Sequence, residues 1–240
     1  MSLIAEQLTP LDCDILCLQE VYGPEDGTAS TFERISASTG LQGFHSPARL
    51  KHRQGRWSSS GLSILSRWPI KAAVAITLPY DPLDGERIAQ LVDIETPHGP
   101  LRVINLHLTH LTGPDAARLR AAQLGEIHRQ ARIDWAGPIV FAGDFNATPD
   151  ETSLQTLLRQ TGYRCSADIM SDTSTLMVGP HRVIDLIVLR EAGSWMMQLA
   201  QTVLADRDHD GVSPSDHKGV LVKIAPLSPV AAIMSDQPRA

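Results

Sequence analysis

One stretch near the middle of the chain limits the possible folds more than any other. It opens with the apolar run Ile139–Ala142, which is typical of a buried strand, and Gly143 follows, where the backbone can turn or pass close to a ligand. Asp144 and Asn146 come two positions apart, so an extended backbone points both side chains the same way. Thr148–Glu151 has the pattern of a capping box, with Thr148 as the N-cap of a helix. Polar groups between a buried strand and a helix are typical of α/β proteins, which bind ligands at strand ends.

Length and composition favour one large α/β domain. With 240 residues, of which 42% are hydrophobic, we expect a domain over residues 1–225 and a loose tail over residues 226–240. The formal net charge of -6 weakly opposes a general affinity for nucleic acid, although it leaves room for a local basic patch. No apolar run is long enough to cross a bilayer.

Cysteine usage predicts a reducing compartment. The three cysteines are an odd number and lack the spacing of metal ligands, and Cys13 and Cys17 are expected to be small buried apolar residues near a strand. No signal peptide is visible at the start of the sequence. We therefore expect a cytoplasmic protein.

Apolar runs and their spacing predict alternating strands and helices. The run Ile15–Leu18 is expected to form an interior strand that ends in Gln19 and Glu20. Helices are expected at residues 2–11, 32–40, 114–132 and 149–160, and further strands at residues 61–67, 73–78, 88–95, 101–108, 183–189 and 219–224. In the strand at residues 101–108, Asn105 and His107 share a face because strand side chains alternate.

A basic cluster covers residues 49–57, from Arg49 to Trp57. The favoured interpretation is a solvated loop. The alternative is a lip that contacts phosphate groups, with Trp57 available for stacking.

Seven polar residues lie in or at the ends of the predicted strands: Glu20, His107, Asp144, Asn146, Asp185, Asp216 and His217. Taken singly, all except Asp144 and Asp185 fit a helix cap, a solvated position or a structural histidine. Asp185 differs, because it lies inside a strand that is apolar on both sides, where a carboxylate is costly unless it is paired. A histidine is its natural partner. Together, the seven residues indicate one functional site.

Several motifs, in this order along the chain, resemble the endonuclease/exonuclease/phosphatase superfamily of DNase I-like phosphoesterases. They are residues 14–20 (Asp-Ile-Leu-Cys-Leu-Gln-Glu), 61–67, 105–108, 143–146 (Gly-Asp-Phe-Asn), 184–187 and 215–217 (Ser-Asp-His). Each motif alone is a modest signal, but their combination is strong. The resemblance implies a four-layered α/β sandwich, in which two packed mixed β-sheets are flanked by helices.

The resemblance also implies a Mg²⁺-dependent phosphoesterase, with Mn²⁺ as a possible substitute. By matched position, Glu20 binds the metal and Asp216 lies at or near it. Asp144 orients and deprotonates the attacking water, and Asn146 holds a phosphate oxygen. Mg²⁺ binds few protein carboxylates and keeps several waters, which agrees with this small ligand set.

The histidines supply the other roles that the resemblance implies. His217 pairs with Asp185 and contacts the scissile phosphate, and His107 contacts the phosphate and assists the leaving group. Asp185 is expected to raise the pKa of His217 and keep it cationic near neutral pH. Positive charge suits this chemistry, because a phosphodiester repels anionic nucleophiles.

The chain departs from the family pattern at its start. Family members usually open with a strand that ends in an asparagine at the site, whereas this sequence begins at the first helix, so the first strand is expected to be missing. Two functions therefore stay open: a hydrolase acting on nucleic acid, a lipid head group or a small phosphoester, and a catalytically weak binding or scaffold relative. No stable membrane insertion is expected, and the oligomeric state is open.

Overall fold

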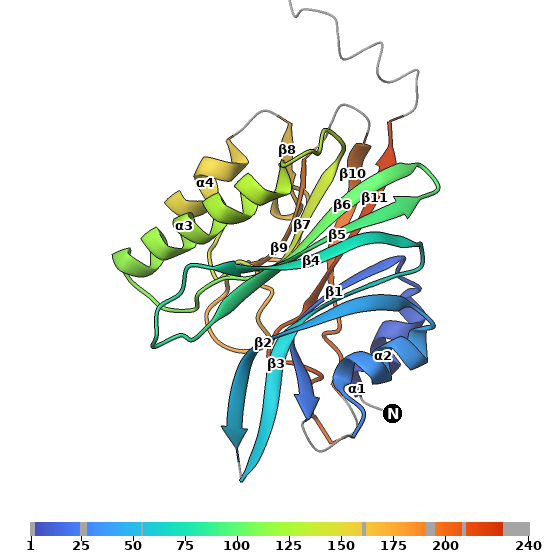
Figure 1. Ribbon diagram of the computed structural model, residues 1–240, viewed down its shortest axis with the longest axis vertical. Helices are drawn as coiled ribbons and strands as arrows, with labels where there is room; N and C mark the ends of the chain where they lie inside the picture. Colours follow the sequence, from blue (N-terminus) through green and yellow to red (C-terminus); the bar gives the residue numbers. More distant parts are fainter. Residues whose placement is uncertain are drawn as a thin grey trace, which may run out of the picture.

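The central sheet contains six strands in the order β4-β5-β6-β7-β9-β8. The computed structural model describes residues 3–24, 28–53, 55–159, 162–190, 195–207 and 210–227 (Figure 1). The strands of this sheet are β4 (Ile70–Leu78), β5 (Arg87–Thr96), β6 (Gly99–His107), β7 (Ile139–Asp144), β8 (Tyr163–Cys165) and β9 (Asp185–Arg190). All neighbours in it are antiparallel except β6 and β7, which are parallel. A parallel pair needs a long crossover, and helix α3 (Pro114–Ala131) lies in it.

Strand β7 shows why the centre of this sheet is buried on both faces. Phe141 packs on one face with residues of α3 and of helix α4 (Thr152–Leu158). Val140 and Ala142 point to the other face and pack against strands of the second layer. A short strand that is apolar on both sides is what a doubly covered sheet requires.

The second layer consists of two antiparallel sheets that pack on the same face of the central sheet. One is a three-stranded sheet, β1 (Ile15–Pro24), β3 (Arg56–Ser66) and β2 (Gln42–Arg53), in the order β1-β3-β2. The other pairs β10 (Trp195–Val203) with β11 (Gly219–Pro226). The fold class is the expected one, but this layer is split and antiparallel rather than one mixed sheet. Among the described residues β1 is the first strand, and helix α1 (Leu3–Leu8) and the 3₁₀ turn η1 (Thr9–Leu11) precede it.

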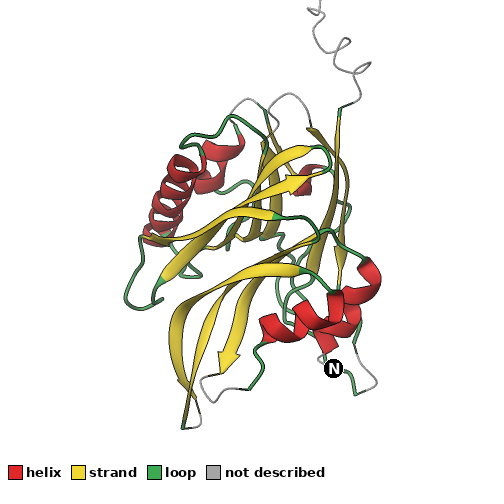
Figure 2. Cartoon of the chain, turned by 45° about the vertical axis from the view of Figure 1, so that its right-hand side comes forward, coloured by secondary structure: helices red, strands yellow, loops and turns green. Residues whose placement is uncertain are grey.

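Helices close the sandwich on both sides. Helices α1 and α2 (Thr31–Thr39) pack on the outer side of the three-stranded sheet, around Leu16, Ile35 and Leu65. Figure 2 shows them at the lower right, across the strands from α3 and α4 at the upper left. The 3₁₀ turn η2 (Ser166–Asp168) follows β8. The resulting order is helices, sheet, sheet, helices, as expected from the resemblance.

In the basic cluster, residues 49–53 of β2 pair with residues 56–60 of β3, so the favoured prediction of a loop is wrong, although Leu50 and Trp57 are exposed, as expected of a solvated segment. Strand β2 is the edge of its sheet, and Pro47 lies where its register with β3 shifts. Proline is tolerated at edges and bulges, and the many polar residues of β2 hide its strand character. The side chains of Lys51, Arg53, Gln54 and Arg56 lie outside the described part of the chain, as does the predicted tail from residue 228 on.

The predicted cap at Thr148 is also wrong. Helix α4 starts at Thr152, with Glu151 as its N-cap residue, and no side-chain capping bond is made there. The Glu151 carboxylate instead accepts two hydrogen bonds from Arg120 of α3, at 2.8 and 2.9 Å, and a further one from Ser153. Arg120 is 4% exposed, and a buried guanidinium needs a counter-charge more than the helix needs its cap.

Candidate active site

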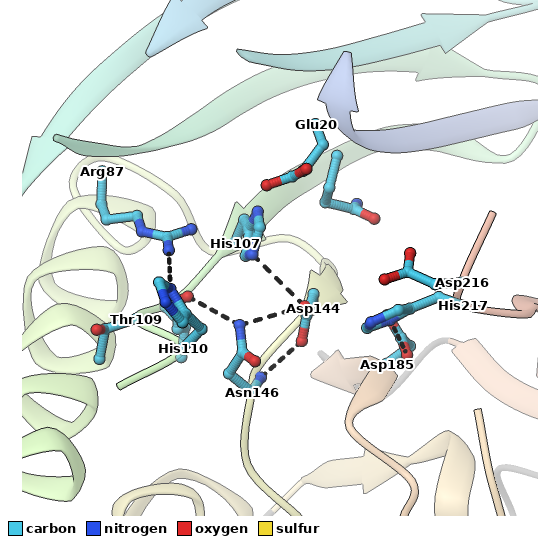
Figure 3. A network of polar contacts seen from close by, with 12 residues as sticks. Glu20, Arg87, His107, Thr109, His110, Asp144, Asn146, Asp185, Asp216 and His217 are labelled. Atoms are coloured by element: carbon cyan, nitrogen blue, oxygen red, sulfur yellow. Dashed lines mark hydrogen bonds and ion pairs between the residues drawn. The ribbon is translucent and has the colours of Figure 1, made fainter. Parts of the chain in front are cut away.

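Three strands of the central sheet end or begin at one place. His107 is the last residue of β6, Asp144 is the last of β7, and Asp185 is the first of β9. In the sheet His107 lies opposite Asp144, and Asp144 lies opposite Asp185. Residues directly opposite each other on paired strands project to the same side, so the three side chains gather together (Figure 3).

The turn after β7 fixes Asp144 and Asn146. Gly143 has a φ of +142°, and a Cβ there would collide with the carbonyl oxygen of Leu106. One carboxylate oxygen of Asp144 accepts the backbone N–H of Asn146 at 2.7 Å, and the other accepts its side-chain amide at 3.2 Å. The same amide donates to the carbonyl oxygen of Leu108 at 3.0 Å. Asn146 has a φ of +51°, a conformation that asparagine adopts more readily than most residues.

The environment of Asp144 favours its protonated form. The residue is 7% exposed. Burial raises the pKa of its carboxyl group to about 7, with a contribution from the negative charge of Asp185 that the nearby His217 opposes. Asp144 can therefore exchange a proton close to neutral pH.

His217 comes from the segment before β11 and joins the group through Asp185. Its Nδ1 lies 3.0 and 2.9 Å from the two carboxylate oxygens of Asp185, so the expected contact between the two residues is present. The hydrogen bond to Asp185 raises the pKa of His217 to about 9, although burial opposes the shift. His217 is therefore cationic at neutral pH.

His107 has the opposite tendency. Its Nε2 lies 3.5 Å from Oδ2 of Asp144. Burial lowers the pKa of His107 well below its usual range, and the positive charges of Arg87 and Arg49 lower it further. His107 is thus a neutral hydrogen-bonding group, whereas His217 is a cation.

Glu20 lies across from these residues, in the second layer. It has a φ of +51° and lies in a β-bulge, where the register of β1 with β3 shifts between Leu18 and Val21. Its side chain is 55% exposed, and its carboxylate pairs with Arg49 at 3.0 Å. Glu20, Arg49, Arg87 and His107 line one pocket, which brings β1 and β2 to the edge of the site.

Sequence reasoning missed the arginines and their partners. Arg87 is 3% exposed and binds the buried carboxylate of Asp84 through Nε at 3.0 Å and through Nη2. Burial raises the pKa of Asp84, but hydrogen bonds from Arg87 and Thr109 outweigh it and hold the pKa at about 2. The spacing of Asp84 and Arg87, just ahead of an apolar strand, was the available signal. Arg49 was noticed only as part of the basic cluster.

The site is rich in oxygen donors that suit a hard divalent cation. Ligand atoms of Asp144, Asp185 and His217 lie within 4.8 Å of one another, a grouping that could hold a metal ion. Glu20 and Asp216, the predicted ligands, are not part of this group, although Figure 3 shows both at its margin and Asp216 is exposed. Carboxylate oxygens open to water are the donors that Mg²⁺ and Mn²⁺ prefer, so the residues fit such an ion.

The protein is thus an α/β sandwich in which acidic and histidine side chains gather at the strand ends. A family model described as the Endonuclease/Exonuclease/phosphatase family matches residues 1–217. The chain belongs to this family, whose members hydrolyse phosphoester bonds.

Solved structures share the fold. An endonuclease/exonuclease/phosphatase from Beutenbergia cavernae is 22% identical, with a TM-score of 0.74 over 93% of this chain and 65% of that one. The human Nocturnin catalytic domain with a bound sulfate anion is 23% identical, with a TM-score of 0.68 over 93% and 85% of the two chains. A mannosyl-6-phosphatase from Bacteroides thetaiotaomicron is 17% identical, with a TM-score of 0.70 over 93% and 90%. At these identities the likeness shows the fold alone.

The comparison with curated proteins finds no significant match. Within the described residues, no helix has both the length and the apolar character needed to cross a membrane.

Proposed function

We propose that the chain is a divalent-metal-dependent hydrolase that cleaves a phosphodiester or phosphomonoester by in-line attack of an activated water. The observation that carries the proposal is the meeting of His107, Asp144, Asp185 and His217 at one point, although they are far apart in the sequence. Folding alone gives no reason to keep a buried carboxylate with a pKa near 7 beside a histidine pair. Membership of a phosphoesterase family agrees with this chemistry.

In this proposal Asp144 is the general base for the attacking water. A base with a pKa near the working pH combines the correct protonation state with a useful driving force for proton transfer. Asn146 fixes the Asp144 carboxylate through its backbone N–H and side chain, and its amide also contacts a phosphate oxygen once substrate is bound.

The histidines have separate roles because their protonation states differ. His217, held cationic by Asp185, contacts the scissile phosphate and stabilises the charge that builds up in the transition state. His107 is neutral and contacts the phosphate as a hydrogen-bonding group on the leaving-group side.

Glu20 and Asp216 are the proposed protein ligands of the cation, which we expect to be Mg²⁺ or Mn²⁺. When bound, this ion polarises the phosphoester and neutralises its negative charge. The Glu20 carboxylate is paired with Arg49, so this pair would have to loosen for Glu20 to bind the ion.

The proposed substrate is either a nucleic acid or a lipid head group or other small phosphoester. The net charge of -6 weakly opposes nucleic acid. The fold is shared with both a phosphatase of a sugar phosphate and the Nocturnin domain, which binds a sulfate anion, so likeness of fold does not choose between them.

Hydrolysis of bis-p-nitrophenyl phosphate and p-nitrophenyl phosphate tests the proposal. We expect turnover that needs added Mg²⁺ or Mn²⁺, stops with a chelator, and exceeds that of an Asp144→Ala/His217→Ala double variant. Turnover no greater than that of the double variant on either compound would instead support the catalytically weak binding relative. For the substrate class, a nuclease should bind DNA with an affinity that falls steeply as salt rises.

A further inference from the structure

Buried amide side chains join the two layers of the sandwich close to the site. Asn105 lies on β6, two residues before His107, and is 0% exposed. Its amide nitrogen donates to the carbonyl oxygens of Leu18 at 2.9 Å and Ser63 at 3.0 Å. Its amide oxygen accepts a hydrogen bond of 2.7 Å from the side chain of Gln19. One side chain of the central sheet thus ties down two strands of the second layer, β1 and β3.

The Asn105 contacts fall on the bulge that carries Glu20. The regular register of β1 stops at Leu18 and resumes at Val21, so Gln19 and Glu20 form the bulge. Asn105 holds the carbonyl group at the start of the bulge and the side chain of its first residue. A Cβ at Gly143 would lie 3.2 Å from the Gln19 side-chain nitrogen, so this amide also rests against the strand that ends in Asp144.

A second buried amide completes the network. The Asn105 nitrogen also lies 3.4 Å from the side-chain oxygen of Gln90 on β5. Gln90 is 0% exposed, and its nitrogen donates to the carbonyl oxygens of Phe44 and Leu62 and to the hydroxyl of Ser46, at 3.0 to 3.2 Å. A buried polar network whose groups are satisfied is rigid and permits one arrangement of the strands.

We propose that Asn105 is a positioning residue that sets where the Glu20 carboxylate stands relative to His107 and Asp144, and thereby sets the affinity of the site for its divalent cation. The inference rests on the proposed function, in which Glu20 is a metal ligand. The Glu20 side chain is 55% exposed, so packing does little to place its carboxylate. Besides its pair with Arg49, its place is set by the backbone of the bulge, which Asn105 holds.

The test is the dissociation constant of Mn²⁺, measured from free Mn²⁺ by electron paramagnetic resonance. We expect Asn105→Ala to raise this constant about 10-fold or more, the range seen when groups that orient a metal ligand are removed. Gln19→Met, which removes the donor to Asn105 and keeps the side-chain length, should cause a smaller rise. Both variants should recover activity at excess Mn²⁺, because the catalytic side chains are unchanged.

Thr96→Val is the matched control for loss of a buried polar group. Thr96 is 6% exposed and its hydroxyl donates to the Gly99 carbonyl oxygen at 2.7 Å, in the β5–β6 turn at the other end of β6. Its Mn²⁺ constant should equal that of the parent. A folded Asn105→Ala protein that binds Mn²⁺ like the parent would overturn the inference. If Asn105→Ala does not fold, an unchanged constant in Gln19→Met overturns it and a raised one supports it.

Failure of the proposed function would give a different result from failure of the Asn105 inference. A parent protein that binds no Mn²⁺ would reject the metal site itself, and this inference with it. A parent that binds Mn²⁺ tightly while Asn105→Ala does so equally well rejects only the positioning role.

Discussion

Three side chains at the site have pKa values that their surroundings shift in different ways. Burial raises the pKa of Asp144, the hydrogen bond that His217 donates to Asp185 raises the pKa of His217, and burial lowers that of His107. The residue types were predictable, since each lies in a short motif at a strand end. Their protonation states were not, because they depend on burial and on charges that other strands bring close.

These shifts predict a bell-shaped dependence of kcat/KM on pH. Asp144 must lose its proton to act as a base, so the rate should rise as pH passes about 7. His217 must keep its proton, so the rate should fall as pH passes about 9. The measurement is kcat/KM with bis-p-nitrophenyl phosphate at saturating metal. A rate that is highest well below pH 7 would contradict the assignment of Asp144 as the base.

An Asp185 variant tests the alkaline limb of this pH profile separately. Asp185→Asn removes the negative charge that holds the proton on His217, so the pKa of His217 should fall and the alkaline limb should move to lower pH. The acidic limb should not move upward, since the same change removes a negative charge that raises the pKa of Asp144.

At the scale of elements, the apolar runs predicted the site strands well. The strands expected at residues 88–95, 101–108 and 183–189 correspond to β5, β6 and β9, with ends that differ by at most two residues. They are buried on both faces, so their composition carries the signal. Strand β2 was not predicted, because an edge strand with many polar residues lacks this pattern. Strand β10 was not predicted either, because apolar residues such as Met196 and Leu199 are exposed and the alternation of apolar and polar residues in β10 is irregular.

The burial of helix α3 was only partly predictable. The helical spacing of Ala117, Ala121, Leu124, His128 and Ala131 in the sequence predicts a buried stripe on this helix. Leu124 and Ala131 of this stripe are buried, but the other buried positions are Ala116, Arg120, Gln123 and Ile127. Two polar side chains are buried because they bond to neighbouring loops: Gln123 donates to the Pro79 carbonyl oxygen, and Arg120 to those of Thr109 and Leu111.

Arg120→Ala should therefore destabilise the fold strongly. It removes the partner of Glu151 and the donor to two loop carbonyl groups, and breaking a buried ion pair costs roughly 3–5 kcal/mol. Arg129→Ala is the control on the same helix, because the Arg129 side chain is 61% exposed and water screens its pair with Glu126, so its loss should change the stability little. Urea unfolding measures both changes. Equal losses of unfolding free energy would contradict a structural role for the Arg120 pair.

At the scale of the whole molecule, the order of layers followed from the motifs rather than from periodicity. Motifs at residues 14–20, 143–146 and 215–217 pointed to a family, and the family implies two stacked sheets with outer helices. Periodicity alone could not have stacked β1 on β6, since that contact joins residues 87 positions apart, such as Leu18 and Asn105. Periodicity likewise could not predict that the second layer is divided into two sheets.

The proposed mechanism depends most on Asp144 as the base that activates water. Its direct test is kcat of Asp144→Asn for bis-p-nitrophenyl phosphate at saturating Mn²⁺, with the exposed Asp115→Asn as control. We predict a loss of about 10²- to 10⁴-fold for Asp144→Asn and parental activity for the control. A folded Asp144→Asn protein that turns over as fast as the parent would contradict this mechanism.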